Sequence, residues 1–285
     1  MNSDERLTLI LKKVERAEKH ILNLEREIQA FLDAEPYKVA TKPNSQYPDI
    51  LPPVYYVASA QAVPVKIALI AGDAIQNIRS SLDHLAWHLV DIGQANLPAP
   101  LTESERKRIG FPIIDTDSPT EYEASRKRKV KGMTQAAIDA IDKTKPYKGG
   151  NDALWKLSQL NNIDKHRLLI TVGAQLAHFA VPTILKRMMI ATMAEKEGVR
   201  VDPNIDVSGV TLNLVPDSRK CPLEEGDELL TGMRSFLEKN EEMKFTFDIV
   251  FNESGVAECE PLLPMLVQTL EYVADLIVCF KPLLA

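Results

Sequence analysis

The amino-acid sequence predicts an α+β fold, with a helical bundle core and a small, mainly antiparallel sheet in the C-terminal half. Several long segments repeat apolar residues every three or four positions, which is typical of amphipathic helices. Between about residues 177 and 252 the composition shifts to β-branched and aromatic residues, which is typical of strands. The 285 residues, 45% of them hydrophobic, suffice for a buried core, and we expect one domain over residues 1–285.

The first predicted helix spans residues 4–33. Its apolar residues alternate spacings of three and four, from Leu7 through Ile21 to Phe31, and so form a heptad seam. Such a seam packs against its own chain or against a second copy, and we favour its own chain. Residues 35–63 contain five prolines, which break regular structure in the middle of this segment. Short strands of a hairpin or an extended arm are expected on either side of that middle part. These strands span residues 37–40 and 54–58.

Three more helices complete the predicted core. They span residues 64–91, 152–172 and 262–280. Pro64 suits a first helical turn, where its missing N–H is not needed, and Gly93 suits a stop. A short helix is expected over residues 134–142. The sheet-rich insertion lies at about 177–252, and its expected strands span residues 183–193, 207–215 and 245–251.

Several classes of protein lack support in this sequence. The net charge of −6 argues against non-specific coating of nucleic acid, although a local basic patch is compatible with it. The three cysteines form no C-x-x-C pair, which indicates reduced thiols. No signal-peptide pattern and no run of about 18 apolar residues is present, so we expect a cytoplasmic protein without membrane association. No phosphate-loop, dinucleotide-binding or nucleophile-elbow motif occurs, and no cofactor is expected.

The segment Gln76–Val90, QNIRSSLDHLAWHLV, combines an apolar helical stripe with four groups that are costly to bury. On a helical wheel, Arg79 and Asp83 lie one turn apart on one flank. On the other side a narrow polar strip borders the core, and it contains Asn77, Ser81, His84 and His88. Arg79 and His84 are about 140° apart, so they face one groove only if another helix, chain or substrate fills it.

Four interpretations of this helix remain open. In the first, Arg79 and Asp83 form an ion pair at i,i+4, and the two histidines have hydrogen-bond partners at the edge of the core. Alternatively, His84 and His88 chelate a metal, completed by one further side chain from Asp83, Asp164 and His166. Third, a histidine transfers protons while an arginine stabilises phosphorane charge, which suits cleavage of RNA by its own 2′-OH. Fourth, the helix lines a binding groove without chemistry.

The stretch from Arg79 to His84 resembles the R-x4-6-H motif of the HEPN superfamily, which are helical proteins that include metal-independent endoribonucleases of toxin–antitoxin and phage-defence systems. The resemblance implies that Arg79 and His84 are catalytic, that Ser80 fills the polar position after the arginine and that Asp83 is an orienting partner. It further implies a homodimer with a shared RNA-cleaving cleft, and an antitoxin protein as a partner. The alternative is a non-catalytic binding or assembly module on the same helical fold.

Two more polar clusters complete the expected RNA-binding surface. The stretch NNIDKHR, residues 161–167, interrupts a second apolar helix, and RKRKVK, residues 126–131, has five basic residues in six. In an acidic chain such a basic run is a candidate for steering phosphate. The expected substrate-binding residues are Asn77, Ser80, His88, Arg126, Lys127, Arg128, Asn162, Lys165 and His166.

Overall fold

The computed structural model describes residues 1–44, 53–96, 99–167, 170–180, 183–202, 205–207, 213–214, 220–231 and 243–285. The fold is α+β, as predicted. The chain divides into two compact units, and each is described by itself. The helical unit contains residues 1–28, 64–171 and 253–285, and the sheet unit contains residues 29–63 and 172–252.

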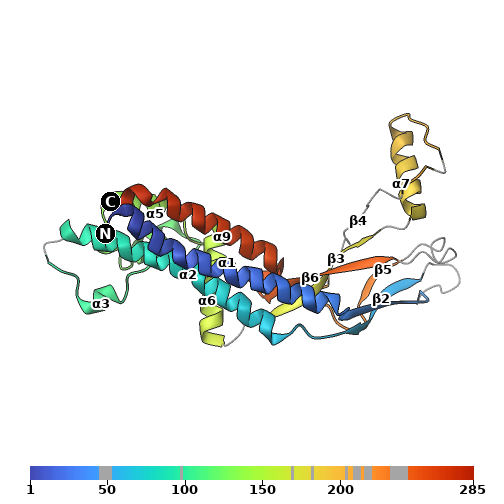
Figure 1. Cartoon of the computed structure of the whole chain (residues 1–285), viewed down its shortest axis with the longest axis horizontal. Coiled ribbons are helices and arrows are strands. Elements are labelled where there is room, and N and C mark those ends of the chain that lie inside the picture. The colour runs from blue at the N-terminus through green and yellow to red at the C-terminus, as the bar shows by residue number, and fades with distance from the viewer. Residues whose placement is uncertain are drawn as a thin grey trace. The chain divides into compact units, whose positions relative to one another are not determined.

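Four long helices build the helical unit. They are α1 (Ser3–Asp33, of which residues 3–28 belong here), α2 (Val65–Gly93), α6 (Asp152–Arg167) and α9 (Leu262–Cys279). Helix α2 contacts both α6 and α9, and α1, α2 and α9 lie alongside one another (Figure 1). An ion pair at either end fixes α1 antiparallel to α2, because Arg6 bonds Asp91 at 2.7 Å and Glu27 bonds Lys66 at 2.6 Å. The predicted helical core is thus present.

The core of this unit follows the predicted apolar periodicity. The seam of α1 is buried inside its own chain, which confirms the intramolecular interpretation; its buried residues are Ile10, Ala17, Ile21, Leu24 and Ile28. The stripe of α2 is buried as well, and its largest side chains are Ile67, Ile75, Ile78, Leu82, Leu85 and Leu89. Burial of one large aliphatic side chain contributes about 1.5–3 kcal/mol, so this contiguous stripe dominates the stability of the unit.

Residues 94–150 wrap the end of α2 with short elements. These are η1 (Gln94–Asn96), α3 (Glu103–Arg106), α4 (Pro119–Arg126) and α5 (Gln135–Lys143), the last of which confirms the expected short helix. Thr102, Ser118 and Thr134 each cap the helix that follows, since their hydroxyls accept a backbone N–H of the first turn. At the end of α2, a Cβ on Gly93 would lie 2.2 Å from the carbonyl oxygen of Gly132, so only glycine permits this close packing.

The sheet unit contains two small sheets. The first has the order β1-β2-β5 and is antiparallel; its strands are β1 (Tyr37–Lys42), β2 (Val54–Ala60) and β5 (Glu228–Thr231). The second has the order β4-β3-β6 within this unit, with β4 (Asn213–Leu214), β3 (Val172–Ala180) and β6 (Lys244–Glu253). Strand β7 (Ala257–Pro261), which follows β6 in the strand order, consists of residues of the helical unit. The expected strands at 37–40, 54–58 and 245–251 are therefore confirmed.

Two predictions of secondary structure are wrong. Residues 183–193 form most of helix α7 (Thr183–Lys196) and not a strand. The β-branched residues suggested a strand, but the segment also contains lysine, arginine, methionine and alanine, which favour helix. The helix expected over 152–172 ends at Arg167, and strand β3 begins at Val172. Most of the strand expected over 207–215 lies outside the described residues, apart from β4.

Helix α9 is the one helix in the described part of the chain with the length and apolar composition to cross a bilayer; its mean hydropathy is 1.6. In the structure it packs against α2 and α6. Its buried stripe includes Leu266, Val273 and Ile277, while Glu271 and Tyr272 are exposed. Because 28% of its residues are buried, α9 packs one apolar stripe into the core of the helical unit and leaves most of its surface outside that core.

Candidate functional site

Arg79 is buried and braces a neighbouring loop. Its side chain is 9% exposed. One Nη donates to Asp83 Oδ1 at 2.8 Å and the other donates to the carbonyl oxygen of Phe111 at 2.9 Å. Asp83 Oδ1 also accepts the Phe111 N–H at 3.0 Å. The i,i+4 pair anticipated from the sequence therefore exists, and together the two side chains satisfy both backbone groups of a fully buried phenylalanine 32 positions away.

We call the pair Arg79–Asp83, together with its hydrogen bonds to the Phe111 backbone, the brace. Beside the brace lies a basic pocket of about 500 Å³. Its lining residues come from α2, from residues 107–110 and 114, and from residues 125, 128 and 129. Its charged lining residues are Arg79, Asp83, Lys107, Arg108, Arg128 and Lys129. Five cations thus surround one carboxylate. Ile109 and Ile114 supply the apolar lining, the Ser125 hydroxyl is a neutral polar group, and no aromatic side chain lines the pocket.

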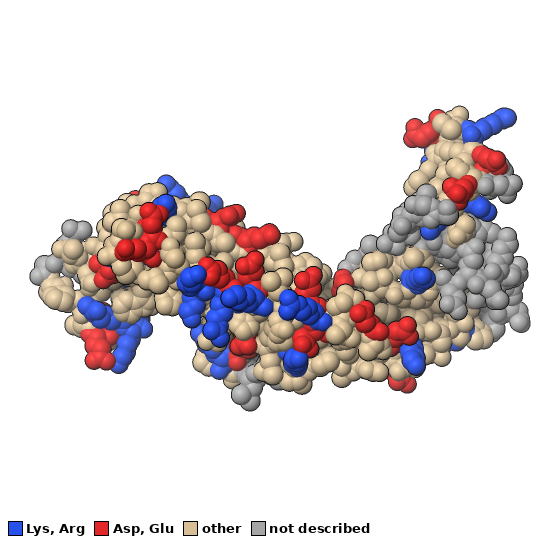
Figure 2. All heavy atoms as spheres, viewed as in Figure 1, with Lys and Arg blue, Asp and Glu red and all other residues tan. Residues whose placement is uncertain are grey.

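The cations of the basic pocket differ in their partners. Lys107 pairs with Glu103 at 2.7 Å on the surface, and basic and acidic side chains lie together where α3 is found (Figure 2). Within the described part of the chain, Arg108, Arg128 and Lys129 form no ion pair. Burial and the nearby Arg79 guanidinium lower the pKa of Lys129, while Asp83 opposes this shift.

His84 and His88 lie on another side of α2. His84 is exposed, and it forms no hydrogen bond or ion pair with the residues that the structure describes. Arg6 Nη1 lies 3.2 Å from His88 Nδ1 and 2.7 Å from Asp91 Oδ2. Arginine can only donate, so His88 Nδ1 accepts and the proton of the neutral ring is on Nε2. Burial and Arg6 lower the pKa of His88; the arginine next to a histidine is thus Arg6 rather than Arg79.

The polar strip drawn from the helical wheel is only partly correct. Ser81 is fully buried and its hydroxyl donates to the carbonyl oxygen of Ile78. Asn77 is half-buried and its amide donates to the carbonyl oxygen of Asp73 in its own helix. Ser80 is half-buried. Arg79, which was expected to border the exposed polar side, is buried because the loop at Phe111 covers it.

The cluster on α6 lies beside a different part of α2. Asn162, Lys165 and His166 are exposed. Between them Asp164 packs against Gly72, where an added Cβ would be 2.4 Å from its Oδ1. Burial and Asp73 raise the pKa of Asp164. None of the three exposed residues lines the basic pocket, so the expectation that they share a groove with Arg79 stays a prediction.

The basic run divides among three roles. Arg126 pairs with Asp142 at 2.7 Å and its buried Nε has no hydrogen-bond partner. Lys127 is exposed and does not line the basic pocket, whereas Arg128 does. The expectation that all three act together on a phosphate therefore holds geometrically for Arg128 alone.

The metal interpretation receives no geometric support from the described residues. No group of three or more His, Cys, Asp or Glu side chains among them is arranged to hold an ion. His84 and His88 thus lack the further ligands that a stable site requires. The side chains proposed to complete the site, Asp164 and His166, belong to the cluster on α6.

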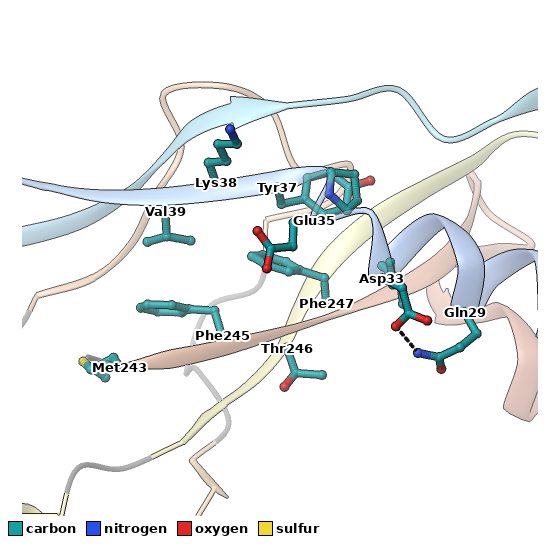
Figure 3. Close-up of a pocket in the computed structure, with 12 residues that line it drawn as sticks. Gln29, Asp33, Glu35, Tyr37, Lys38, Val39, Met243, Phe245, Thr246 and Phe247 are labelled. Atoms are coloured by element: carbon teal, nitrogen blue, oxygen red, sulfur yellow. Dashed lines mark hydrogen bonds between the residues drawn. The ribbon is translucent and has the colours of Figure 1, made fainter. Parts of the chain in front are cut away.

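A second cavity, of about 640 Å³, lies in the sheet unit (Figure 3). Aromatic side chains of β1 and β6 face it, with the rings of Tyr37 and Phe247 5.0 Å apart. Burial raises the pKa of Tyr37 to about 12, so this phenol stays neutral at physiological pH. Asp33 lies at one end of the cavity beside Gln29, while Glu35 lies close to Tyr37 and Phe247. None of the residues singled out from the sequence lines it.

No family model, curated protein or solved structure matches the chain. Sequence reasoning did not single out Arg6, Lys107 or Arg108, which geometry brings into these sites, and it included Lys129 only as part of the basic run at residues 126–131. The local excess of positive charge between residues 106 and 131 was the available signal for Lys107, Arg108 and Lys129. Arg6 gave no signal, because it lies 82 positions from His88 in an ordinary amphipathic helix.

Proposed function

We propose that the helical unit acts on RNA as a HEPN-like, metal-independent endoribonuclease in which His84 transfers the proton. The observation that supports this most directly is the exposed imidazole of His84 on α2, which no described residue engages. An imidazole can accept a proton through one ring nitrogen and return it, which is what a general acid–base group in RNA cleavage requires.

The reaction needs only RNA and the protein. The 2′-oxygen attacks the adjacent phosphorus while its proton passes to His84, and the bond from phosphorus to the 5′-oxygen breaks. The leaving oxygen takes a proton from the imidazolium, which restores neutral His84. The products are a 2′,3′-cyclic phosphate and a 5′-hydroxyl end. Removing such an acid–base group lowers a rate by about 10²–10⁴-fold.

In this proposal Arg79 is a positioning residue. Two of its five N–H donors are occupied by Asp83 and the Phe111 carbonyl, and its side chain is 9% exposed, so most of the guanidinium is shielded from solvent. Asp83 is occupied in the same brace rather than with His84. The resemblance assigns both residues to catalysis, whereas their contacts favour support of the loop beside α2.

The test is cleavage of end-labelled RNA in excess EDTA by the native chain, His84→Ala and the matched control His178→Ala. His178 lies on β3 in the sheet unit and is not among the expected site residues, so the control makes the same chemical change elsewhere. We expect cleavage by the native chain and the control, with a loss of about 100-fold or more in His84→Ala. Unchanged cleavage in His84→Ala would contradict the proposal.

A non-catalytic binding module is the second candidate, and the commitment of Arg79 to its brace favours it. It predicts RNA binding without turnover by all three proteins. A homodimer, an antitoxin partner and a role in phage defence belong to the first proposal, since they follow from the resemblance. Light scattering over micromolar concentrations tests the homodimer, and a strictly monomeric chain would contradict a cleft built from two protomers.

A further inference from the structure

The basic pocket concentrates positive charge in a chain of net charge −6. Arg79 forms an ion pair with Asp83, and Lys107 forms one with Glu103. These pairings leave Arg108, Arg128 and Lys129 as three cations around one hollow, with no ion pair among the described residues. Like charges held this close repel one another, so the arrangement is stabilised when an anion enters.

Lys129 is the most informative of the three. It is half-buried, unlike the exposed Arg108 and Arg128, so part of its hydration has been lost. Burial and Arg79 lower its pKa, which means that the folded chain already disfavours its charge. A bound anion would favour the charged form of the ammonium group and so oppose the effect of burial and Arg79.

We propose that the basic pocket is a binding site for a phosphoryl group, held by Arg108, Arg128 and Lys129. Guanidinium groups match phosphate oxygens with pairs of N–H donors, and an ammonium group adds a compact point charge. The Ser125 hydroxyl is available as a neutral donor. The volume of about 500 Å³ exceeds the need of a bare ion and lies in the range of small-ligand sites.

The residues that line the pocket also indicate that it does not recognise a nucleotide base. Ile109 and Ile114 are its apolar residues, and it has no aromatic ring on which a base could stack. Recognition therefore rests on the phosphoryl group and is independent of base identity. The group can belong to an RNA backbone or to a small phosphorylated molecule.

The structure explains how the three cations are held in place. The brace of Arg79 and Asp83 fixes the backbone at Phe111, directly after the segment that contains Lys107 and Arg108. Gly110 allows this approach, because a Cβ there would lie 2.9 Å from Asp83 Oδ1. The Gly110 N–H also donates to the carbonyl oxygen of Lys129 at 3.4 Å, which links the two basic segments.

The experiment is isothermal titration calorimetry of the full chain with pyrophosphate at low ionic strength. Arg128→Gln and Lys129→Gln remove a lining charge. Lys127→Gln is the matched control, because Lys127 is adjacent in sequence and exposed but does not line the pocket. We expect pyrophosphate to bind the native chain and Lys127→Gln alike, and to bind both pocket variants about tenfold or more weakly. Circular dichroism verifies that the variants are folded.

A second arm identifies the source of the phosphoryl group. If pyrophosphate displaces fluorescein-labelled RNA and Arg128→Gln weakens RNA binding, the ligand is an RNA backbone. If RNA binding is unchanged in Arg128→Gln while pyrophosphate binding falls, the ligand is a small phosphorylated molecule. Absence of pyrophosphate binding by the native chain, or an equal loss in Lys127→Gln, overturns the proposal. His84→Ala should bind pyrophosphate normally, so failure of RNA cleavage and failure of this site are distinguishable.

Discussion

Replacing Arg79 with alanine separates a structural role from a catalytic one. Arg79 is 7% exposed and bonds Asp83 and the carbonyl oxygen of Phe111. The Phe111 carbonyl keeps the Ile113 N–H as a donor at 2.9 Å, so the substitution removes one hydrogen bond from a charged group, which contributes about 1.5–3 kcal/mol. The ion pair adds at most about 1 kcal/mol, because the Asp83 side chain is 39% exposed and solvent screens it. We therefore expect Arg79→Ala to lower the free energy of unfolding by about 2–4 kcal/mol.

The assay is urea unfolding followed by tryptophan fluorescence. Both tryptophans, Trp87 and Trp155, belong to the helical unit, so the signal reports on the unit that contains Arg79. For a unit of this size the expected change corresponds to a melting temperature lower by about 4–16 °C. His84→Ala is the control, since replacement of an exposed side chain usually changes stability by no more than about 0.5 kcal/mol.

A double-mutant cycle with Asp83→Ala makes the test sharper. If both side chains support the same loop, the cost of removing both is smaller than the sum of the single costs. The reasoning is refuted if Arg79→Ala is as stable as the native chain yet no longer cuts RNA. That result would assign the guanidinium to the substrate, as the HEPN resemblance implies.

Two more predictions follow from particular contacts. Gly93→Ala should destabilise the chain more than Gly110→Ala, because its new Cβ would meet backbone 2.2 Å away whereas the other meets the end of a side chain at 2.9 Å; urea midpoints of the two variants decide this order. The lowered pKa of His88 means that the unfolded chain binds more protons between the folded pKa and about 6.5, so stability falls as pH is lowered through that window. In urea titrations between pH 7.5 and 5, His88→Gln should flatten the slope of the free energy of unfolding against pH, while His84→Ala keeps that slope. An unchanged slope in His88→Gln would contradict the assignment of this pH dependence to His88.

Local spacing predicted the four long helices of the helical unit, the short helix α5, three of the strands and the pairing of Arg79 with Asp83. A repeat of three and four residues sets one apolar face wherever the segment lies, and an i,i+4 pair meets on any helix. The same local patterns failed at α7, where β-branched residues and helix formers compete within one segment. Propensity alone does not decide such a case, because the surrounding structure contributes more than the local preference.

Only the tertiary structure decided which polar groups share a site. The loop at Phe111 covers Arg79 from 32 positions away, and Lys129 joins the same pocket from 50 positions along the chain. The cluster on α6 lies beside Gly72 and Asp73 instead, although its composition suggested a place next to Arg79. A sequence fixes the chemistry of each side chain and its neighbours within one or two helical turns. Which distant segments meet depends on how the apolar faces pack, and that packing buried Arg79 and left His84 exposed.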